Sequence, residues 1–129
     1  MAYDILIVDD SVVVRKVLMK TFGMTDIQVQ SFQEAQNGKV GLEKMKQQKF
    51  DIVFLDINMP VMNGVDFMKQ MVSDPALANT PVVVISTEGS KDRLDELNAC
   101  GIKAFLRKPV SPETLVEAIN KVVGGLDNV

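Results

Sequence analysis

Acidic residues directly follow two short apolar segments of the chain. The segment Ile5–Val8 leads into Asp9 and Asp10, and Ile52–Leu55 leads into Asp56. Two or three carboxylate oxygens suit Mg²⁺, which binds a few carboxylates and keeps several of its waters. A carboxylate can also accept a phosphoryl group and become an acyl phosphate. Any one of these acids could be a helix N-cap, but three that converge without a cation would oppose one another's ionisation.

Two further apolar segments are followed by hydroxyl and ammonium groups. Val82–Ile85 leads into Ser86 and Thr87, and Ile102–Leu106 shortly precedes Lys108. A hydroxyl and an ammonium at one rim can bind the equatorial oxygens of a phosphoryl group as negative charge builds on them. Taken alone, Ser86 suits a turn or a cap, and Lys108 suits a solvated surface charge. The composition therefore permits phosphoryl chemistry without requiring it.

The apolar segments that carry these residues are predicted strands. Short unbroken apolar runs fit strands buried on both faces, and the more polar Val29–Ala35 fits an edge strand. Apolar residues at helical spacing follow each strand, and Ser11, Gly23 and Pro112 match an N-cap, a C-cap and a first helical position. The predicted helices cover about 11–23, 38–49, 64–73, 90–99 and 111–125, and the apolar residues of the first are Val14, Val17, Leu18 and Phe22.

Strand and helix alternate five times, which predicts an α/β fold. Such alternation with right-handed crossovers gives a doubly wound three-layer sandwich, with helices on both faces of a parallel sheet. The carboxyl ends of the strands meet at one edge, where open α/β sheets bind ligands. We expect a single domain over residues 1–129, with a core at about 3–123, a short polar C-terminal tail and no output domain.

The composition excludes several classes of function. Because the 129 residues include no histidine, Ser-His-Asp and Cys-His catalysis and most zinc sites are excluded. The net charge of −3 argues against a nucleic-acid partner, and no apolar run approaches the ~20 residues of a membrane span. The single cysteine, Cys100, and an N-terminus without a secretory pattern favour a cytoplasmic protein, for which a monomer is the default expectation.

The order of these motifs resembles the receiver domain of bacterial two-component response regulators. The chain is similar in particular to the stand-alone chemotaxis regulators of the CheY type. This resemblance implies a flavodoxin-like (βα)5 fold with a five-stranded parallel sheet in the order 2-1-3-4-5. Five separated places over about residues 3–123 carry the match: Asp9-Asp10, Asp56, Met59-Pro60 with Asn63-Gly64, Ser86, and Lys108-Pro109.

The resemblance implies that Asp56 accepts a phosphoryl group from the phosphohistidine of a sensor histidine kinase. Asp10 would hold Mg²⁺ together with Asp56, and Asp9 would help directly or through water. The backbone carbonyl of Asn58 would complete the protein ligands. Because Asn58 stands where an Asp-x-Asp phosphatase has the acid that protonates the leaving group, we expect a signalling protein and not an enzyme. It would catalyse only its own phosphorylation and dephosphorylation.

The resemblance also implies roles in binding, switching and timing. Lys108 and the Ser86 hydroxyl would bind the acyl-phosphate oxygens, after which Ser86 would move inward and Phe105 would fill the space it leaves. Asn58 and Glu88 would flank the attacking water and set the lifetime of the acyl phosphate. Many chemotaxis regulators carry tyrosine where this chain has Phe105. A phenylalanine ring can still switch by packing, but it lacks the hydroxyl for a polar contact to a target.

The resemblance favours a chemotaxis response regulator whose phosphorylation switches a protein-binding surface. That surface is expected on helix 90–99, strand 102–106 and the last helix, and a phosphatase is a possible further partner. The open alternatives are a phosphorelay intermediate, a regulator of another pathway, or a degenerate receiver that acts as an interaction module without phosphorylation. The last would normally have lost Asp56 or Lys108. A flavin-binding module of this fold is disfavoured, because Asp9-Asp10 would repel the flavin phosphate.

Overall fold

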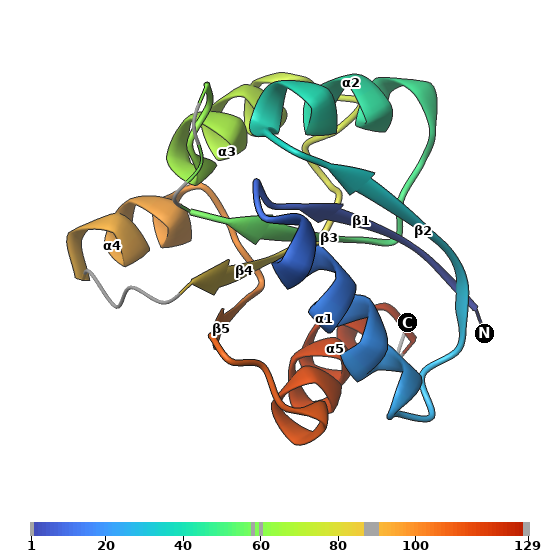
Figure 1. Cartoon of the computed structure of the whole chain (residues 1–129). Helices are drawn as coiled ribbons and strands as arrows, with labels where there is room; N and C mark the ends of the chain where they lie inside the picture. Colours follow the sequence, from blue (N-terminus) through green and yellow to red (C-terminus); the bar gives the residue numbers. More distant parts are fainter. Residues whose placement is uncertain (1, 58, 60, 87–90, 128–129) are drawn as a thin grey trace.

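The computed structural model describes residues 2–57, 59, 61–86 and 91–127, with side chains for all of these except 91–94 and 123–127. Its described part alternates strand and helix five times (Figure 1). All strands run parallel in the order β2-β1-β3-β4-β5, which confirms the predicted doubly wound, flavodoxin-like fold. The strands are β1 (Tyr3–Val8), β2 (Val29–Ala35), β3 (Ile52–Asp56), β4 (Val82–Ser86) and β5 (Ala104–Arg107). The helices are α1 (Val12–Gly23), α2 (Gly38–Gln47), α3 (Gly64–Ser73), α4 (Lys91–Ala99) and α5 (Pro112–Asp127).

The sheet separates two sets of helices (Figure 1), and an apolar layer lies on each of its faces. Helices α1 and α5 pack against one face, and α2, α3 and α4 cover the other. Because side chains alternate along a strand, Ile5 and Ile7 of β1 join the first layer, whereas Leu6 and Val8 join the second. The central strands β3 and β4 are buried along their whole length. Close packing on both faces therefore fixes the residues at which they end.

The register of the sheet brings polar strand ends to one edge. Val8 pairs with Leu55 across β1 and β3. Asp9 and Asp56, the next residues along these two segments, therefore lie side by side at the same end of the sheet. Ser86 ends β4, which is the neighbour of β3 on its other side. The strand pairing alone thus gathers three of the predicted site residues.

Polar side chains begin four of the described helices, including α5, where Oγ of Ser111 accepts from the N–H of Thr114 at 3.2 Å. The side chains of Ser11, Asn37 and Asn63 accept hydrogen bonds of 3.2, 2.9 and 2.9 Å from the backbone N–H three residues further on. Such N-caps satisfy donors that have no partner within the helix. Ser11 and Asn63 therefore lead the chain into a helix shortly after the strand ends that carry the acids.

The connection between α4 and β5 differs from the prediction. Strand β5 covers Ala104–Arg107 rather than 102–106. The N–H of Ile102 donates to the carbonyl of Leu97 at 3.4 Å, and Gly101 has a φ of +90°. This left-handed glycine closes the helix as the sequence predicted. Ile102 lies outside the strand because its N–H serves the end of α4 instead.

Helix α1 includes the glycine that was predicted to cap it, and α5 ends later than predicted. Gly23 is the last residue of α1 and Met24 is its C-cap, so the predicted glycine cap was wrong by one residue. Helix α5 continues past Gly124-Gly125 to Asp127. A glycine costs a helix interior only about 1 kcal/mol, so this pair does not have to end one. Within the described residues, no helix combines the length and the apolar character needed to cross a membrane.

Candidate functional site

Three carboxylates meet at the C-terminal edge of the sheet. Asp9 and Asp10 follow β1, Asp56 ends β3, and one carboxylate oxygen from each lies within 4.8 Å of the others. Asp9 and Asp56 are only 4% and 7% exposed, whereas Asp10 is exposed. The structure therefore brings together the three acids that the sequence singled out, with two of them buried.

All four polar atoms of Asp9 have partners within the protein. Its N–H donates to the carbonyl of Ala35 at 3.0 Å, and its own carbonyl accepts a 2.6 Å hydrogen bond from Nη1 of Arg15. Its Oδ1 accepts from the N–H of Ser11 at 2.9 Å, and its Oδ2 accepts from Nζ of Lys108 at 3.0 Å. A buried carboxylate with donors on both oxygens is well satisfied. Asp9 is therefore a fixed part of the site.

Lys108 connects the acids to the ends of β4 and β5. Its ammonium lies 3.0 Å from Oδ2 of Asp9 and 3.7 Å from Oδ2 of Asp56, and its side chain is only 17% exposed. Its backbone N–H donates to the carbonyl of Ser86 at 3.0 Å. The sheet thus fixes the backbone of Lys108, and the carboxylates hold its charge. The structure places Lys108 among the acids; its predicted role in phosphate binding stays a prediction.

The donor set of this site fits a divalent cation. Among the described residues, Lys108 is the cation that pairs with these carboxylates, and it balances only one of their three charges. Negatively charged carboxylates this close repel one another, and a bound cation relieves that repulsion. Oxygen ligands are those that Mg²⁺ prefers. The acid cluster could therefore hold a metal ion. Asn58, the remaining predicted ligand, lies outside the described residues.

Ser86 and Phe105 lie on the same face of the sheet. Phe105 pairs with Val84 in the β4–β5 ladder and packs on the same apolar layer as Val84. Ser86 stands two residues further along β4, so its side chain points to that same face. Ser86 is fully buried and Phe105 is half-buried. The two predicted switch residues are thus diagonal neighbours, while their coupled movement stays a prediction.

The predicted output surface is described only in part. Phe105 of β5 packs against the layer that contains Leu97 of α4, and α5 packs against β5. Strand β5 therefore packs on one face against the apolar layer to which α4 contributes, and on the other face against α5. The predicted timing residues Asn58 and Glu88 lie outside the described residues.

A glycine allows α3 to approach the end of β3. The N–H of Gly64 donates to the carbonyl of Ile57 at 2.8 Å. A Cβ at this position would lie 2.8 Å from the Cα of Ile57 and 3.0 Å from the carbonyl oxygen of Asp56. Both neighbours are backbone atoms, which cannot rotate out of the way. The turn that follows the central acid therefore requires glycine here.

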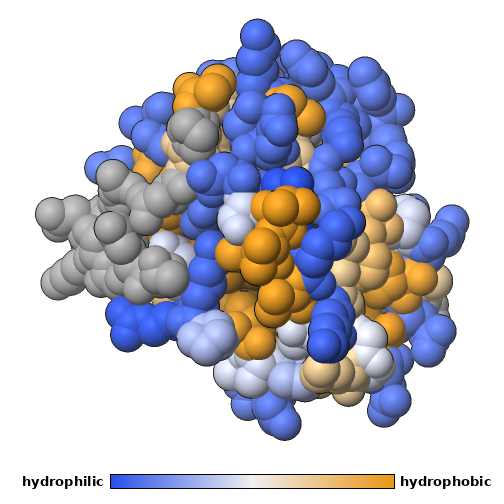
Figure 2. Space-filling model, in the orientation of Figure 1, coloured by the Kyte–Doolittle hydropathy of each residue, from blue (hydrophilic) through white to orange (hydrophobic). Residues whose placement is uncertain are grey.

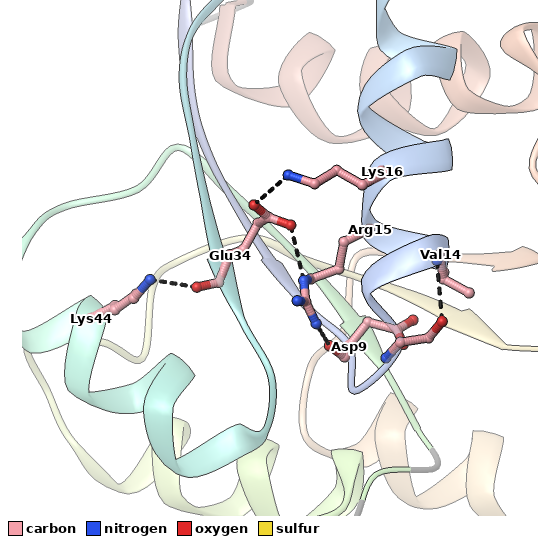
Figure 3. A network of polar contacts seen from close by, with 7 residues as sticks. Asp9, Val14, Arg15, Lys16, Glu34 and Lys44 are labelled. Atoms are coloured by element: carbon pink, nitrogen blue, oxygen red, sulfur yellow. Dashed lines mark hydrogen bonds and ion pairs between the residues drawn. The ribbon is translucent and has the colours of Figure 1, made fainter.

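Arg15 and Glu34, which the sequence did not single out, adjoin the site (Figure 3). Besides its bond to Asp9, Arg15 donates through Nε to Oε1 of Glu34 at 3.0 Å. Glu34 also pairs with Lys16 at 3.1 Å, and its carbonyl accepts from Lys44. Burial raises the pKa of Glu34, but the hydrogen bonds and charges of Arg15 and Lys16 outweigh it and hold the pKa below its ordinary 4.5. In the sequence, Glu34 is an acid in a predicted edge strand, and Arg15-Lys16 is a basic pair in a predicted helix. No spacing rule links the two, so the sequence alone does not predict that they pair.

An apolar cavity of about 350 Å³ lies between α1 and the sheet, beside the acids. The cavity is lined by apolar side chains and by residues of the site: Val13, Val17, Val110, Asp9, Asp56 and Lys108. Figure 2 shows an apolar patch on the exposed surface of α1, where Val13 and Val17 are 67% and 54% exposed. Of the apolar residues at helical spacing in α1, Leu18 and Phe22 pack toward the sheet, whereas Val17 lies beside the cavity.

The chain has extensive similarity to known proteins. Residues 5–120 match the family model of the response regulator receiver domain. The chemotaxis protein CheY of Thermotoga maritima is 40% identical over 119 residues, which cover 92% of this chain and 95% of that protein. The chemotaxis protein CheY-3 of Vibrio cholerae is 33% identical over 118 residues, which cover 92% and 89%. The solved structure of Vibrio cholerae CheY4 has a TM-score of 0.83 at 31% identity, and the match covers 95% of this chain and 99% of that one.

Proposed function

Because the chain belongs to the response regulator receiver family, we propose that it is a stand-alone response regulator of the chemotaxis type. In this proposal Asp56 accepts a phosphoryl group from the phosphohistidine of a sensor histidine kinase, and the modification switches a protein-binding surface. The observation that carries the proposal is the meeting of Asp56 with Asp9, Asp10 and the ammonium of Lys108 at one edge of the sheet. The names of the two curated relatives support a chemotaxis pathway.

The proposed reaction is a substitution at phosphorus. A carboxylate oxygen of Asp56 forms the new P–O bond while the P–N bond to the donor histidine breaks, and the electron pair of that bond returns to the imidazole. Asp56 ends a strand that is buried along its whole length. Its carboxylate is therefore already oriented, which lowers the entropic part of the barrier. Water later attacks the acyl phosphate, which releases inorganic phosphate and restores the carboxylate.

Asp9, Asp10 and Asp56, with the backbone carbonyl of Asn58, would hold Mg²⁺. The ion supplies stabilisation of the negative charge on the transferring phosphoryl group. Within the chain, Asp9 is fixed through both carboxylate oxygens. Asp10 is the exposed member of the cluster. We therefore assign to Asp10 the direct contact with the ion, and to Asp9 a direct or water-mediated one.

We propose that the ammonium of Lys108 moves its hydrogen bond from Asp9 to a phosphoryl oxygen on Asp56. This ammonium is already within ion-pair distance of Asp56 at 3.7 Å. Phosphoryl oxygens on Asp56 would compete strongly for this donor, because hydrogen bonds between charged groups are the stronger ones. The Ser86 hydroxyl would bind a second oxygen and move, and Phe105, on the same face of the sheet, would fill the space.

The surface that changes is formed by α4, β5 and α5, and we propose that a downstream protein binds there. Phe105 would act on this surface by packing alone. Asn58 and Glu88 would set how long the acyl phosphate lasts, and we include a phosphatase among the proposed partners. We place the protein in the cytoplasm as a monomer that binds neither nucleic acid nor membrane.

Backbone amide NMR spectra test this switch directly. Adding Mg²⁺ and a small acyl phosphate should shift the signals near Asp56 and also those of α4, β5 and α5. Phe105→Ala should reduce the shifts on that surface while those near Asp56 remain. Wild-type shifts confined to the surroundings of Asp56 would contradict a switched surface.

A further inference from the structure

Arg15 joins the edge strand of the sheet to the backbone of the acid site (Figure 3). Its Nη1 donates a 2.6 Å hydrogen bond to the carbonyl oxygen of Asp9, and its Nε donates a 3.0 Å hydrogen bond to Oε1 of Glu34. The Arg15 side chain is only 13% exposed. A planar guanidinium presents its donors in a fixed fork. One rigid group therefore sets the position of the Asp9 carbonyl relative to β2.

The carbonyl that Arg15 holds belongs to the peptide bond between Asp9 and Asp10. Because a peptide unit is planar, fixing the direction of this carbonyl also fixes the plane from which Asp10 continues. The carboxylate of Asp9 is already held by Ser11 and Lys108. The hydrogen bond from Arg15 therefore affects the orientation of Asp10, the exposed acid of the cluster, more than that of the Asp9 side chain.

Glu34 provides a firm anchor for the guanidinium. It lies on β2 and pairs with Ile7 of β1, two residues before Asp9. Its carboxylate takes hydrogen bonds from Arg15 and Lys16, and its own carbonyl accepts from Lys44 of α2. These contacts keep Glu34 charged, which is consistent with the lowered pKa of its carboxyl. The anchor is therefore part of the sheet itself.

We propose that Arg15 is a positioning residue for cation binding, which aligns the Asp9–Asp10 peptide so that Asp10 meets the ion bound by the acid cluster. This inference rests on the proposed function, because it assumes a cation at Asp9, Asp10 and Asp56. Arg15 does not touch the cation or the phosphoryl group. It acts through the backbone carbonyl of Asp9 and, like other groups that orient metal ligands, does so without touching the ion.

Lys16 provides a matched control on the same helix. It pairs with the other oxygen of the same Glu34, at 3.1 Å, and its side chain is 63% exposed. Arg15 and Lys16 thus carry the same charge and share one partner, but the contact to Asp9 comes from Arg15. If the contacts of Glu34 mattered only for charge or only for folding, loss of Arg15 and loss of Lys16 would have similar effects. A positioning role requires Arg15 and not Lys16.

Isothermal titration calorimetry with Mg²⁺ on the full chain tests the proposal. We expect Arg15→Gln to weaken Mg²⁺ affinity by about tenfold, the lower end of the loss seen when groups that orient metal ligands are removed. Lys16→Gln should stay within about twofold of wild type, because the Asp9 peptide keeps its partner. Arg15→Lys should fall between these two variants, since one ammonium cannot contact Asp9 and Glu34 in the fork geometry. Melting temperatures without metal report folding separately.

A second pair of variants separates positioning from general support. Glu34→Ala should weaken Mg²⁺ binding in the wild-type background, because the guanidinium loses its anchor. The same substitution should have no further effect in the Arg15→Gln background, since Glu34 acts through Arg15. Full additivity of the two losses would overturn this chain of action. If Arg15→Gln does not fold, the comparison of Arg15→Lys with Lys16→Gln decides the question.

The outcomes distinguish the inference from the proposed function. Mg²⁺ binding by wild type with equal affinities for Arg15→Gln and Lys16→Gln would overturn the positioning role and leave the proposed function standing. No measurable binding of Mg²⁺ by wild type would overturn the metal site of the proposed function, and the positioning role with it. A selective loss in Arg15→Gln would support both.

Discussion

The ammonium of Lys108 donates a 3.0 Å hydrogen bond to the carboxylate of Asp9, across 99 positions of the chain. The same ammonium lies 3.7 Å from Asp56. Lys108 thus compensates the negative charge of two buried carboxylates. With a cation held by Asp9, Asp10 and Asp56, Lys108 would be available to bind a phosphoryl group on Asp56.

Lys108→Gln should therefore destabilise the metal-free protein by about 3 kcal/mol, because two buried carboxylates would lose their cation. Mg²⁺ should restore part of this loss in the variant. Urea unfolding with a chelator and with Mg²⁺ measures both effects. Arg107→Gln removes the same charge from the exposed neighbouring position, and it should stay close to wild type. Equal effects of the two substitutions would contradict the assigned role of Lys108.

Asp56→Asn should stabilise the metal-free protein by about 1 kcal/mol or more, because it removes one of three mutually repelling carboxylates. Asp26→Asn makes the same charge change at an exposed turn, and it should leave the melting temperature nearly unchanged. Thermal unfolding in a chelator compares the two variants. A melting temperature of Asp56→Asn at or below that of wild type would count against a shared acidic pocket.

Convergence of Asp9, Asp56 and Lys108 was predictable, because it depends on local patterns. Each residue follows a short apolar strand, and parallel strands deliver their carboxyl ends to one edge. The pairing of Arg15 with Glu34 was not predictable. It requires the register in which Glu34 pairs with Ile7, together with the rotation of α1 about its own axis. Neither quantity is contained in the pattern of a single segment.

The exposure of Val17 illustrates a related limit. Helical spacing identifies an apolar face but not how much of that face the sheet covers. Leu18 and Phe22 reach the sheet, while Val17 borders the open cavity. Helix α5 shows a second limit of local patterns. Gly124-Gly125 is a local signal for a helix end, but the helix continues past it to Asp127.

Gly64→Ala should destabilise the protein by about 2 kcal/mol, since the new Cβ would meet backbone atoms of Ile57 and Asp56. Gly23→Ala is the matched control, because a Cβ there meets nothing within 4 Å. It should be neutral or stabilising by up to about 1 kcal/mol. Urea unfolding measures both variants, and equal losses would show that the close approach at Gly64 can relax.

Glu34 should make stability depend on pH in the acid range. Its pKa is lowered in the folded protein from the ordinary 4.5, so its stabilisation is complete above that value and is lost as the pH falls through the lower folded pKa. At about pH 7, Glu34→Gln should be less stable than wild type by up to about 1 kcal/mol. Urea unfolding of both proteins at decreasing pH should show this difference shrinking below pH 4.5. A difference that stays constant would refute the link to ionisation.

Intact-mass spectrometry tests the central proposal most directly. Wild type and Asp56→Asn are each treated with a small acyl phosphate, with Mg²⁺ and with a chelator. We expect one phosphoryl adduct on wild type that depends on Mg²⁺ and is absent from Asp56→Asn. No adduct on wild type, or an adduct that survives in Asp56→Asn, would contradict the assignment of Asp56 as the phosphoryl acceptor.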